Sequence, residues 1–196
     1  MLIPTVIDKS SSWERAYDIY SRLLEDRIVF LGSAIDDQVA NTVIAQLLFL
    51  EKQDSKKPII MYVQSPWWHV TAWLAIYDTM QHVSCPVHTV SVWLSASMWS
   101  IILCWWEKWK RFALPHAEIM IHQPLWWAEW QATDIRLAAE HIIKTWDRLY
   151  KILAKHSWKD LKQVEKDCDR DNFMTSEEAL EYWLIDKIIW NKSEAK

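Results

Sequence analysis

The sequence predicts a single α/β domain, because short apolar segments typical of strands alternate with amphipathic segments typical of helices. The chain has 196 residues, 51% of them hydrophobic and 24% charged. A chain of this length can form one core without disulfides or a structural metal, and this composition excludes wholesale disorder. Neither a linker nor a strong internal repeat divides the sequence. We therefore expect one domain over residues 1–196.

The expected elements follow from hydrophobic periodicity in chain order. From the N-terminus these are a loose segment over about 1–14, a helix over 15–25, a strand over 27–31, a helix over 36–52, a strand over 58–63, a helix over 69–80, a strand over 86–93, a short helix from Ser97, strands over 111–114 and 118–122, helices over 132–155, 160–166 and 176–182, and a strand near 185–189.

Two of these segments have especially clear sequence patterns. In 36–52, Asp36 is a helix cap, and Val39, Val43, Leu47 and Leu50 share one face. The near-continuous apolar run over 58–63 is typical of a strand that is covered on both faces. Both segments favour a layered α/β arrangement.

Charge and cysteine content narrow the function classes. Lys plus Arg number 22 against 26 for Asp plus Glu, a net charge of −4, and the one basic cluster is Lys108, Lys110 and Arg111. Nucleic acid is therefore not an expected partner. The 3 cysteines, Cys85, Cys104 and Cys168, indicate reduced thiols in a cytosol-like compartment. With no signal-peptide pattern and no run of about 18 apolar residues, no membrane association is expected.

Tryptophan and glycine usage is anomalous. The chain has 16 Trp and 1 Gly, whereas average usage predicts roughly fourteen glycines. Trp67 follows Ser65-Pro66, and proline at the second place of a turn often goes with positive φ at the next residue. Trp105, Trp158 and Trp183 follow helical stretches, where a left-handed cap favours glycine. We hypothesise that most of the tryptophans occupy glycine positions of the natural protein, through engineering or an error in the recorded sequence. The alternative, a tryptophan-rich surface for sugars or lipid, gives no reason to select turn positions.

Histidine spacing argues against a zinc site, since no His has another His three or four residues away. The segment Ser95-Ala96-Ser97-Met98 places small residues where a buried strand gives way to an apolar helix. A hydroxyl there meets backbone N–H groups and the positive end of the helix dipole, which suits a nucleophilic serine. An ordinary serine cap is the competing interpretation.

The sequence also contains candidates for a general base and for an acid that orients it. His122 ends an apolar strand and precedes Gln123-Pro124, so its ring is placed at the sheet edge, where it can act as a general base or be merely structural. Asp167, Asp169 and Asp171 all follow the helix over 160–166. Spacing alone does not choose among them, and a solvated charged loop is the default interpretation.

Together these segments resemble the ClpP family, the proteolytic subunits of the Clp protease, over nearly the whole chain. The resemblance is carried by YDIYSRLL (17–24), AQLLFL (45–50), AIYDTM (75–80), ASM (96–98), MIHQP (120–124), QATD (131–134) and DRDNF (169–173). It implies a self-compartmentalised serine peptidase with a crotonase-like α/β fold: stacked sheets, flanking helices and a long protruding helix.

The resemblance also implies a catalytic apparatus. The family pattern puts the nucleophile at Ser97, the base at His122 and the orienting acid at Asp171. Backbone N–H groups at Trp68 and Met98 form the oxyanion hole. The family motif Ser-Pro-Gly-Gly reads Ser65-Pro66-Trp67-Trp68 here, and an indole at 68 crowds the cleft, so we expect a nearly inactive polypeptide, since one lost donor costs about 100-fold or more in turnover.

The implied assembly is two stacked heptameric rings, joined through a strand and helix over about 123–155. Gln131, Asp169 and Arg170 are expected near that contact, and segment 1–14 is expected to line an axial pore. Unfolded substrates would arrive from an AAA+ unfoldase of the ClpX or ClpA/ClpC type. The family's apolar docking pocket for the unfoldase maps to Ile60, Tyr62, Val90, Phe112, Leu114 and Ile189, which as strand residues could equally be plain core.

No cofactor or metal is implied, because the unfoldase consumes the ATP. The expected location is the bacterial cytoplasm, or the mitochondrial matrix or plastid stroma if a transit peptide has been removed. A serine endopeptidase subunit is thus the predicted function. The alternatives are a non-catalytic ring subunit with a docking or structural role, and another crotonase-fold enzyme that uses paired amides on a thioester.

Overall fold

The computed structural model describes residues 2–9, 14–65, 70–96, 110–123 and 131–191. Its elements, in chain order, are β1 (Thr5–Lys9), β2 (Glu14–Asp18), α1 (Ile19–Glu25), β3 (Ile28–Leu31), α2 (Asp37–Gln53), β4 (Ile59–Ser65), α3 (Val70–His82), β5 (Val87–Ala96), β6 (Arg111–Ala113), β7 (Glu118–Ile121), α5 (Ala132–Ser157), α6 (Leu161–Asp167), β8 (Asn172–Thr175), α7 (Ser176–Glu181) and β9 (Lys187–Ile188). The predicted mixed α/β class is confirmed, with a mostly parallel sheet and flanking helices.

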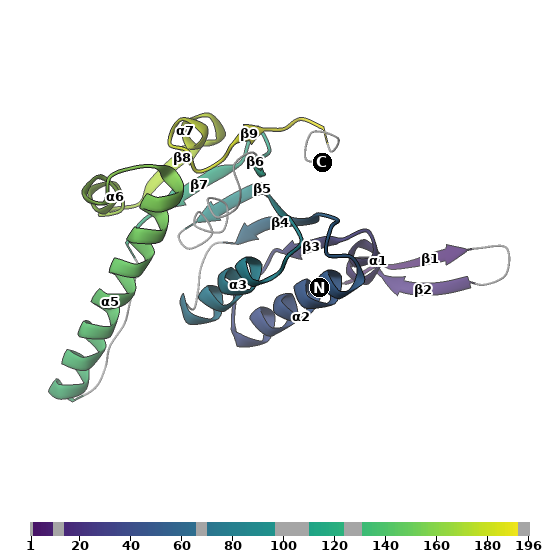
Figure 1. The fold of residues 1–196 in the computed structure, drawn as a ribbon, viewed down its shortest axis with the longest axis horizontal. Helices are drawn as coiled ribbons and strands as arrows, with labels where there is room; N and C mark the ends of the chain where they lie inside the picture. Colours follow the sequence, from purple (N-terminus) through teal and green to yellow (C-terminus); the bar gives the residue numbers. More distant parts are fainter. Residues whose placement is uncertain (1, 10–13, 66–69, 97–109, 124–130, 192–196) are drawn as a thin grey trace.

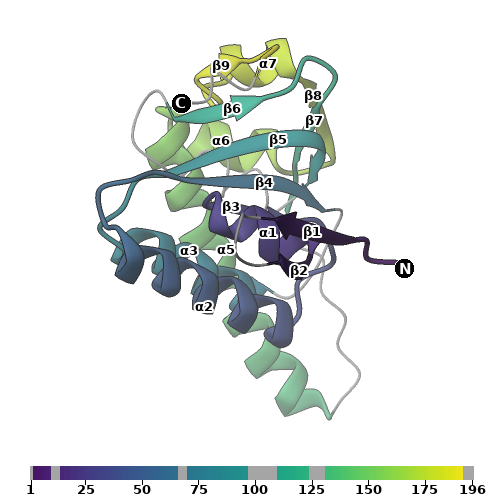
Figure 2. The same cartoon turned by 90° about the vertical axis from the view of Figure 1, so that its right-hand side faces the viewer.

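The main sheet branches at β5. Strands β3, β4 and β5 lie side by side and parallel. The far edge of β5 pairs first with β6 and then with β7, both in parallel. β9 extends the β6 branch, and β8 pairs antiparallel with β7. The resemblance predicted stacked sheets. In the structure, the two layers are branches of one hydrogen-bonded sheet (Figure 2).

Helices α2 and α3 lie side by side against the sheet (Figure 1). The Asp36 side chain accepts a hydrogen bond from the Val39 N–H at 2.8 Å, as predicted for a helix cap. Of the predicted apolar face, Val43, Leu47 and Leu50 are buried. This face packs in the main core with Ile59, Met61 and Val63 of β4 and with Trp73 and Ile76 of α3.

A second apolar cluster forms because side chains alternate across β4. Ile60 belongs to a cluster with Val90, Phe112 and Ile189, and Tyr62 and Leu114 pack against it. Both faces of the central strands are therefore covered by apolar side chains, as the continuous apolar run predicted.

Two elements project from opposite ends of the molecule: the β1–β2 hairpin and the N-terminal half of α5 (Figure 1). α5 has 26 residues. Near its C-terminal end Leu149 and Leu153 are buried in the main core, whereas Ile135, Leu137 and Ile143 are exposed. In the described part of the chain, no helix is long and apolar enough to cross a membrane.

The structure differs from the expected elements at both ends of the chain. Segment 1–14, expected to be loose, contains β1, which pairs with Glu14–Asp18. The helix expected over 15–25 begins at Ile19 because Asp18 caps it, accepting from the Ser21 N–H at 2.9 Å. Strand β8 was not expected, and the last strand is shorter than expected, at Lys187–Ile188. The short helix expected from Ser97 lies outside the described residues.

Candidate active site

β7 and β8 bring a histidine and an aspartate together. In their antiparallel ladder Ile121 lies opposite Asn172, so the next residue along one strand faces the previous residue along the other. These residues are His122 and Asp171, and the distance from His122 Nδ1 to Asp171 Oδ1 is 3.0 Å. A strand that the sequence did not reveal therefore creates the pair.

The surroundings of the two groups differ. The His122 side chain is 3% exposed, whereas the Asp171 side chain is 57% exposed. An ionised carboxylate only accepts hydrogen bonds, so a neutral imidazole donates through Nδ1 and carries its lone pair on Nε2. This is the tautomer that a general base requires for accepting a proton at Nε2.

The other two candidate aspartates contact different groups. Tyr182 donates its hydroxyl to Asp167 Oδ2 at 2.7 Å. The Asp169 carboxylate is exposed and lies 3.8 Å from Arg170 Nε. The Asp169 main-chain carbonyl accepts from Gln123 Nε2 at 2.9 Å, which ties the loop that carries Asp171 to the end of β7. Of the three aspartates, Asp171 is the one hydrogen-bonded to the imidazole.

Ser97, Met98 and Trp68 lie outside the described residues, but the strands that lead to them are described. Ser65 of β4 pairs with Ser95 of β5, and Ala96 pairs with Met120 of β7. These three strands are parallel, so their carboxyl ends lie at one edge of the sheet, where parallel α/β sheets bind ligands.

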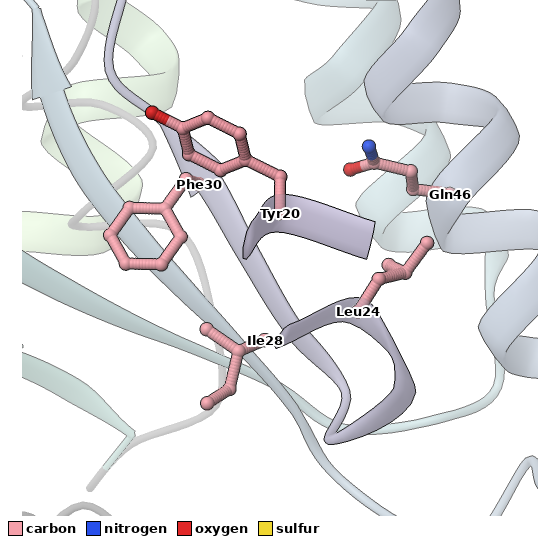
Figure 3. Close-up of a pocket in the computed structure, with 5 residues that line it drawn as sticks. All are labelled: Tyr20, Leu24, Ile28, Phe30 and Gln46. Carbon is pink, nitrogen blue, oxygen red and sulfur yellow. The ribbon is translucent and has the colours of Figure 1, made fainter. Parts of the chain in front are cut away.

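The residues expected to dock an unfoldase form one group. All six belong to the second apolar cluster: Ile60, Tyr62, Val90, Phe112, Leu114 and Ile189. Val90 is fully buried and Tyr62 is half-buried, and the Tyr62 ring stacks on Phe30 with centroids 5.1 Å apart. Phe30 also lines a pocket of about 70 Å³ with Tyr20, Leu24, Ile28 and Gln46, which come from α1, β3 and α2 (Figure 3).

The residues expected at a ring contact are all exposed. Gln131 precedes α5, at the end of the helix that projects farthest from the sheet (Figure 1). Asp169 and Arg170 lie in the loop before β8, with side chains 71% and 89% exposed. Gln131 is therefore separated from Asp169 and Arg170 by the protruding helix α5.

The described residues contain no group of three or more His, Cys, Asp or Glu side chains that could hold a metal ion. His156 and Cys168 are among the buried groups outside the site whose pKa values are perturbed. Burial, together with the nearby charges of Lys155 and Arg111, lowers the pKa of His156 to about 4. Burial and the nearby Asp167 raise the pKa of the Cys168 thiol to about 12, so it stays protonated at neutral pH.

A buried histidine oriented by an aspartate, at the ligand-binding edge of a mostly parallel sheet, is an arrangement used by hydrolases. Comparison with models of protein families matches residues 11–192 to the Clp protease family. The chain therefore belongs to the Clp protease family, as the resemblance predicted. Membership makes it a ClpP-like protease subunit and implies an oligomeric assembly that works with an unfoldase.

Sequence reasoning missed β8 and the Gln123 contact. Asn172-Phe173-Met174-Thr175 includes two residues with strand preference, Phe173 and Thr175. Four residues are too few to show a convincing period of two. The Gln123 amide reaches a carbonyl 46 positions away, and nothing in the local sequence signals such a contact.

Proposed function

We propose that this chain is a serine endopeptidase subunit that uses Ser97, His122 and Asp171 as a triad. The observation that carries the proposal is the 3.0 Å contact between His122 Nδ1 and Asp171 Oδ1. Ser97 Oγ attacks the peptide carbonyl carbon, and His122 accepts the hydroxyl proton and gives it to the leaving amine. Water then cleaves the acyl-enzyme ester by the same route. Asp171 holds the imidazole in the required tautomer.

The strand register supports Ser97 as the nucleophile. Ala96 pairs with Met120 in parallel. Ser97 directly follows Ala96 in the sequence, and His122 comes two residues after Met120. The described end of β5, which precedes Ser97, therefore lies beside the end of β7 that precedes His122. Ser97 precedes the apolar segment that begins at Met98, which suits oxyanion stabilisation by main-chain amides.

Trp68 and Met98 are the proposed amide donors for the oxyanion. Ser65 pairs with Ser95, so the ends of β4 and β5 that precede Trp68 and Met98 in the sequence lie side by side. The indole at position 68 is expected to hinder substrate at this point, where the family motif has glycine. Turnover by this sequence is therefore proposed to be slow.

The proposed assembly is two stacked heptameric rings that degrade unfolded polypeptides delivered by an AAA+ unfoldase of the ClpX or ClpA/ClpC type. The exposed apolar residues of α5 support a contact between rings, and the cluster that contains Tyr62 supports a docking role. No cofactor is required by the chain itself. The proposed location is the bacterial cytoplasm, or the mitochondrial matrix or plastid stroma.

A non-catalytic ring subunit is the second candidate, and the tryptophan at position 68 favours it. Such a subunit would keep the fold and the docking cluster without turnover. The exposed Asp171 carboxylate beside a buried imidazole argues for the catalytic candidate instead.

Two measurements test the proposal. Hydrolysis of a short fluorogenic peptide without ATP is expected to be slow but measurable, and to be lost in Ser97→Ala. A fluorophosphonate is expected to label the unmodified chain and not Ser97→Ala, because labelling requires an activated hydroxyl. Hydrolysis retained in Ser97→Ala would contradict the assignment of the nucleophile. A folded, assembled chain that shows neither activity would favour the non-catalytic subunit.

A further inference from the structure

β5 contains a bulge next to its carboxyl end, and two buried serines face each other across it. Val63 of β4 pairs with Ser91, but Ser65 pairs with Ser95, so two residues of β4 advance against four of β5. Four extended residues span about 13 Å, yet Ser91 Oγ and Ser95 Oγ are 2.7 Å apart. Two side chains of serine length do not bridge 13 Å, so the strand is contracted by a bulge between them.

The bulge coincides with the branch point of the sheet. β6 pairs with β5 up to Ser91, whose carbonyl also accepts from the Leu114 N–H at 2.9 Å. β7 begins to pair at Leu94, three residues later. The change of neighbour therefore takes place inside the segment that the two serines close. The branch that begins there carries His122 at its end.

The hydroxyl pair is shut off from solvent, since Ser91 and Ser95 are both 0% exposed. A buried hydroxyl is strongly destabilising unless it is hydrogen-bonded. The Ser91–Ser95 contact is thus a link that favours the closed bulge over an extended strand, and bulges beside active sites commonly redirect side chains.

We propose that Ser91 and Ser95 are positioning residues: by closing the bulge they hold the carboxyl end of β5, the strand that leads to Ser97, beside the end of β7 that leads to His122. The inference rests on the proposed function, in which Ser97 is the nucleophile. Neither serine contacts substrate, so the pair acts through the strand.

The test compares Ser91→Ala, Ser95→Ala, the double alanine variant and Ser91→Thr. Misplacing a reacting group by about 1 Å costs up to about 100-fold, so we expect each alanine variant to slow fluorophosphonate labelling about 10- to 100-fold. The peptide KM and the pH midpoint of labelling should stay unchanged, because the His122–Asp171 pair is intact. Ser91→Thr keeps the hydroxyl and should label within about 3-fold of the unmodified chain, by the same positional argument.

The double alanine variant distinguishes a positioning role from a role in which each serine only provides a hydrogen-bond partner for the other buried hydroxyl. It removes both polar groups, so its Tm should recover relative to the single variants, while labelling should stay slow because the bulge is no longer closed. Recovery of both Tm and labelling rate would overturn the inference.

Failure of the proposed function gives a different result. If labelling of the unmodified chain does not depend on Ser97, the proposed function fails and hydrogen exchange decides the inference instead. Faster exchange confined to Leu94–Ala96 and Glu118–Ile121 in the alanine variants would uphold the positioning role. Unchanged exchange in these segments would overturn it.

Discussion

His122 combines burial with a partner that is open to solvent. Its imidazole is 3% exposed, and its hydrogen-bonded carboxylate is 57% exposed. Burial fixes the ring by packing, and the carboxylate fixes its tautomer. The proposed role of general base requires a set position and a defined protonation site, and residues next to the ends of two different strands, β7 and β8, supply them.

Replacing the acid tests this division of roles. We expect Asp171→Asn to lower kcat for a fluorogenic peptide by about 10³-fold or more, because an amide can stabilise the wrong imidazole tautomer, with little change in KM. Asp169→Asn is the matched control, since the Asp169 carboxylate lies beside Arg170 and is exposed. A large loss in Asp169→Asn with full activity in Asp171→Asn would contradict the assignment of the acid.

The residue at position 68 governs the expected rate. Trp68→Gly should raise peptide turnover by about 100-fold or more, because a glycine amide approaches the oxyanion without an indole in the cleft. Trp190→Gly is a control, since Trp190 is 74% exposed near the C-terminus. Rapid turnover by the unmodified chain would show that the indole does not obstruct the site.

At the scale of elements, two helices end at tryptophans whose backbone conformations suit glycine. Trp158 has φ 58° at the end of α5, and Trp183 has φ 68° just after α7. Past α7, the Trp183 N–H donates to the Leu180 carbonyl and the Leu184 N–H donates to the Ala179 carbonyl. This is the hydrogen-bond pattern of a Schellman cap, which favours glycine at position 183. The expectation of left-handed caps at these two tryptophans is confirmed, and Trp105 lies outside the described residues.

Glycine at these caps should stabilise the fold. Left-handed backbone costs a non-glycine residue roughly 1–2 kcal/mol, so we expect Trp158→Gly and Trp183→Gly each to raise Tm by about 2–4 °C in thermal denaturation. Trp190→Gly again serves as the control, because Trp190 is exposed and has no positive φ. An equal rise in the control would contradict the strain argument.

The end of α5 also carries a pH-sensitive group. Arg111 donates to the His156 carbonyl at 3.1 Å, and burial with nearby positive charge lowers the pKa of His156 from 6.5 to about 4. The unfolded chain binds the proton first, so stability falls as pH drops from about 6.5 toward 4.

We expect His156→Gln to lose less stability than the unmodified chain over this pH window, as measured by chemical denaturation at pH 7 and at pH 4.5. The comparison isolates the His156 contribution because the other groups that titrate are common to both chains. Equal losses in the two chains would contradict the proposed pH dependence.

At the scale of the whole molecule, the two projecting elements make few contacts with the rest of the chain. The N-terminal half of α5 exposes Ile135, Leu137 and Ile143. Exposed apolar side chains on a projecting helix are typical of an interaction surface. This agrees with the oligomeric assembly implied by membership of the Clp protease family.

Native mass spectrometry tests the proposed double ring. Ile143→Glu should convert stacked rings into single rings, because a charge is costly in an apolar interface. Lys144→Glu, at the neighbouring exposed position, is the control. Stacked rings retained in Ile143→Glu would contradict a role of Ile143 in the ring contact.

The same measurement gives the subunit mass. A subunit mass of 23.4 kDa would exclude an error in the recorded tryptophans.

The sequence by itself predicted most elements of the fold, because their periodicity is local. The Asp36 cap and the face with Val43, Leu47 and Leu50 were read from adjacent positions and are confirmed. The β1–β2 hairpin and β8 were not predicted, since pairing with a distant strand stabilises segments whose own pattern is too short to recognise.

For the site, residue patterns identified Ser97 and His122 as candidates but left three aspartates open, because loop sequence does not encode where a carboxylate points. The family resemblance pointed to Asp171, but only the tertiary structure shows that His122 is hydrogen-bonded to it, since β7 and β8 meet with Ile121 opposite Asn172. The branch of the sheet at Ser91 and Ser95 was equally hidden. The physical reason is the same in both cases: local periodicity is a property of neighbouring residues, whereas strand register is set by contacts between segments that are far apart in the chain.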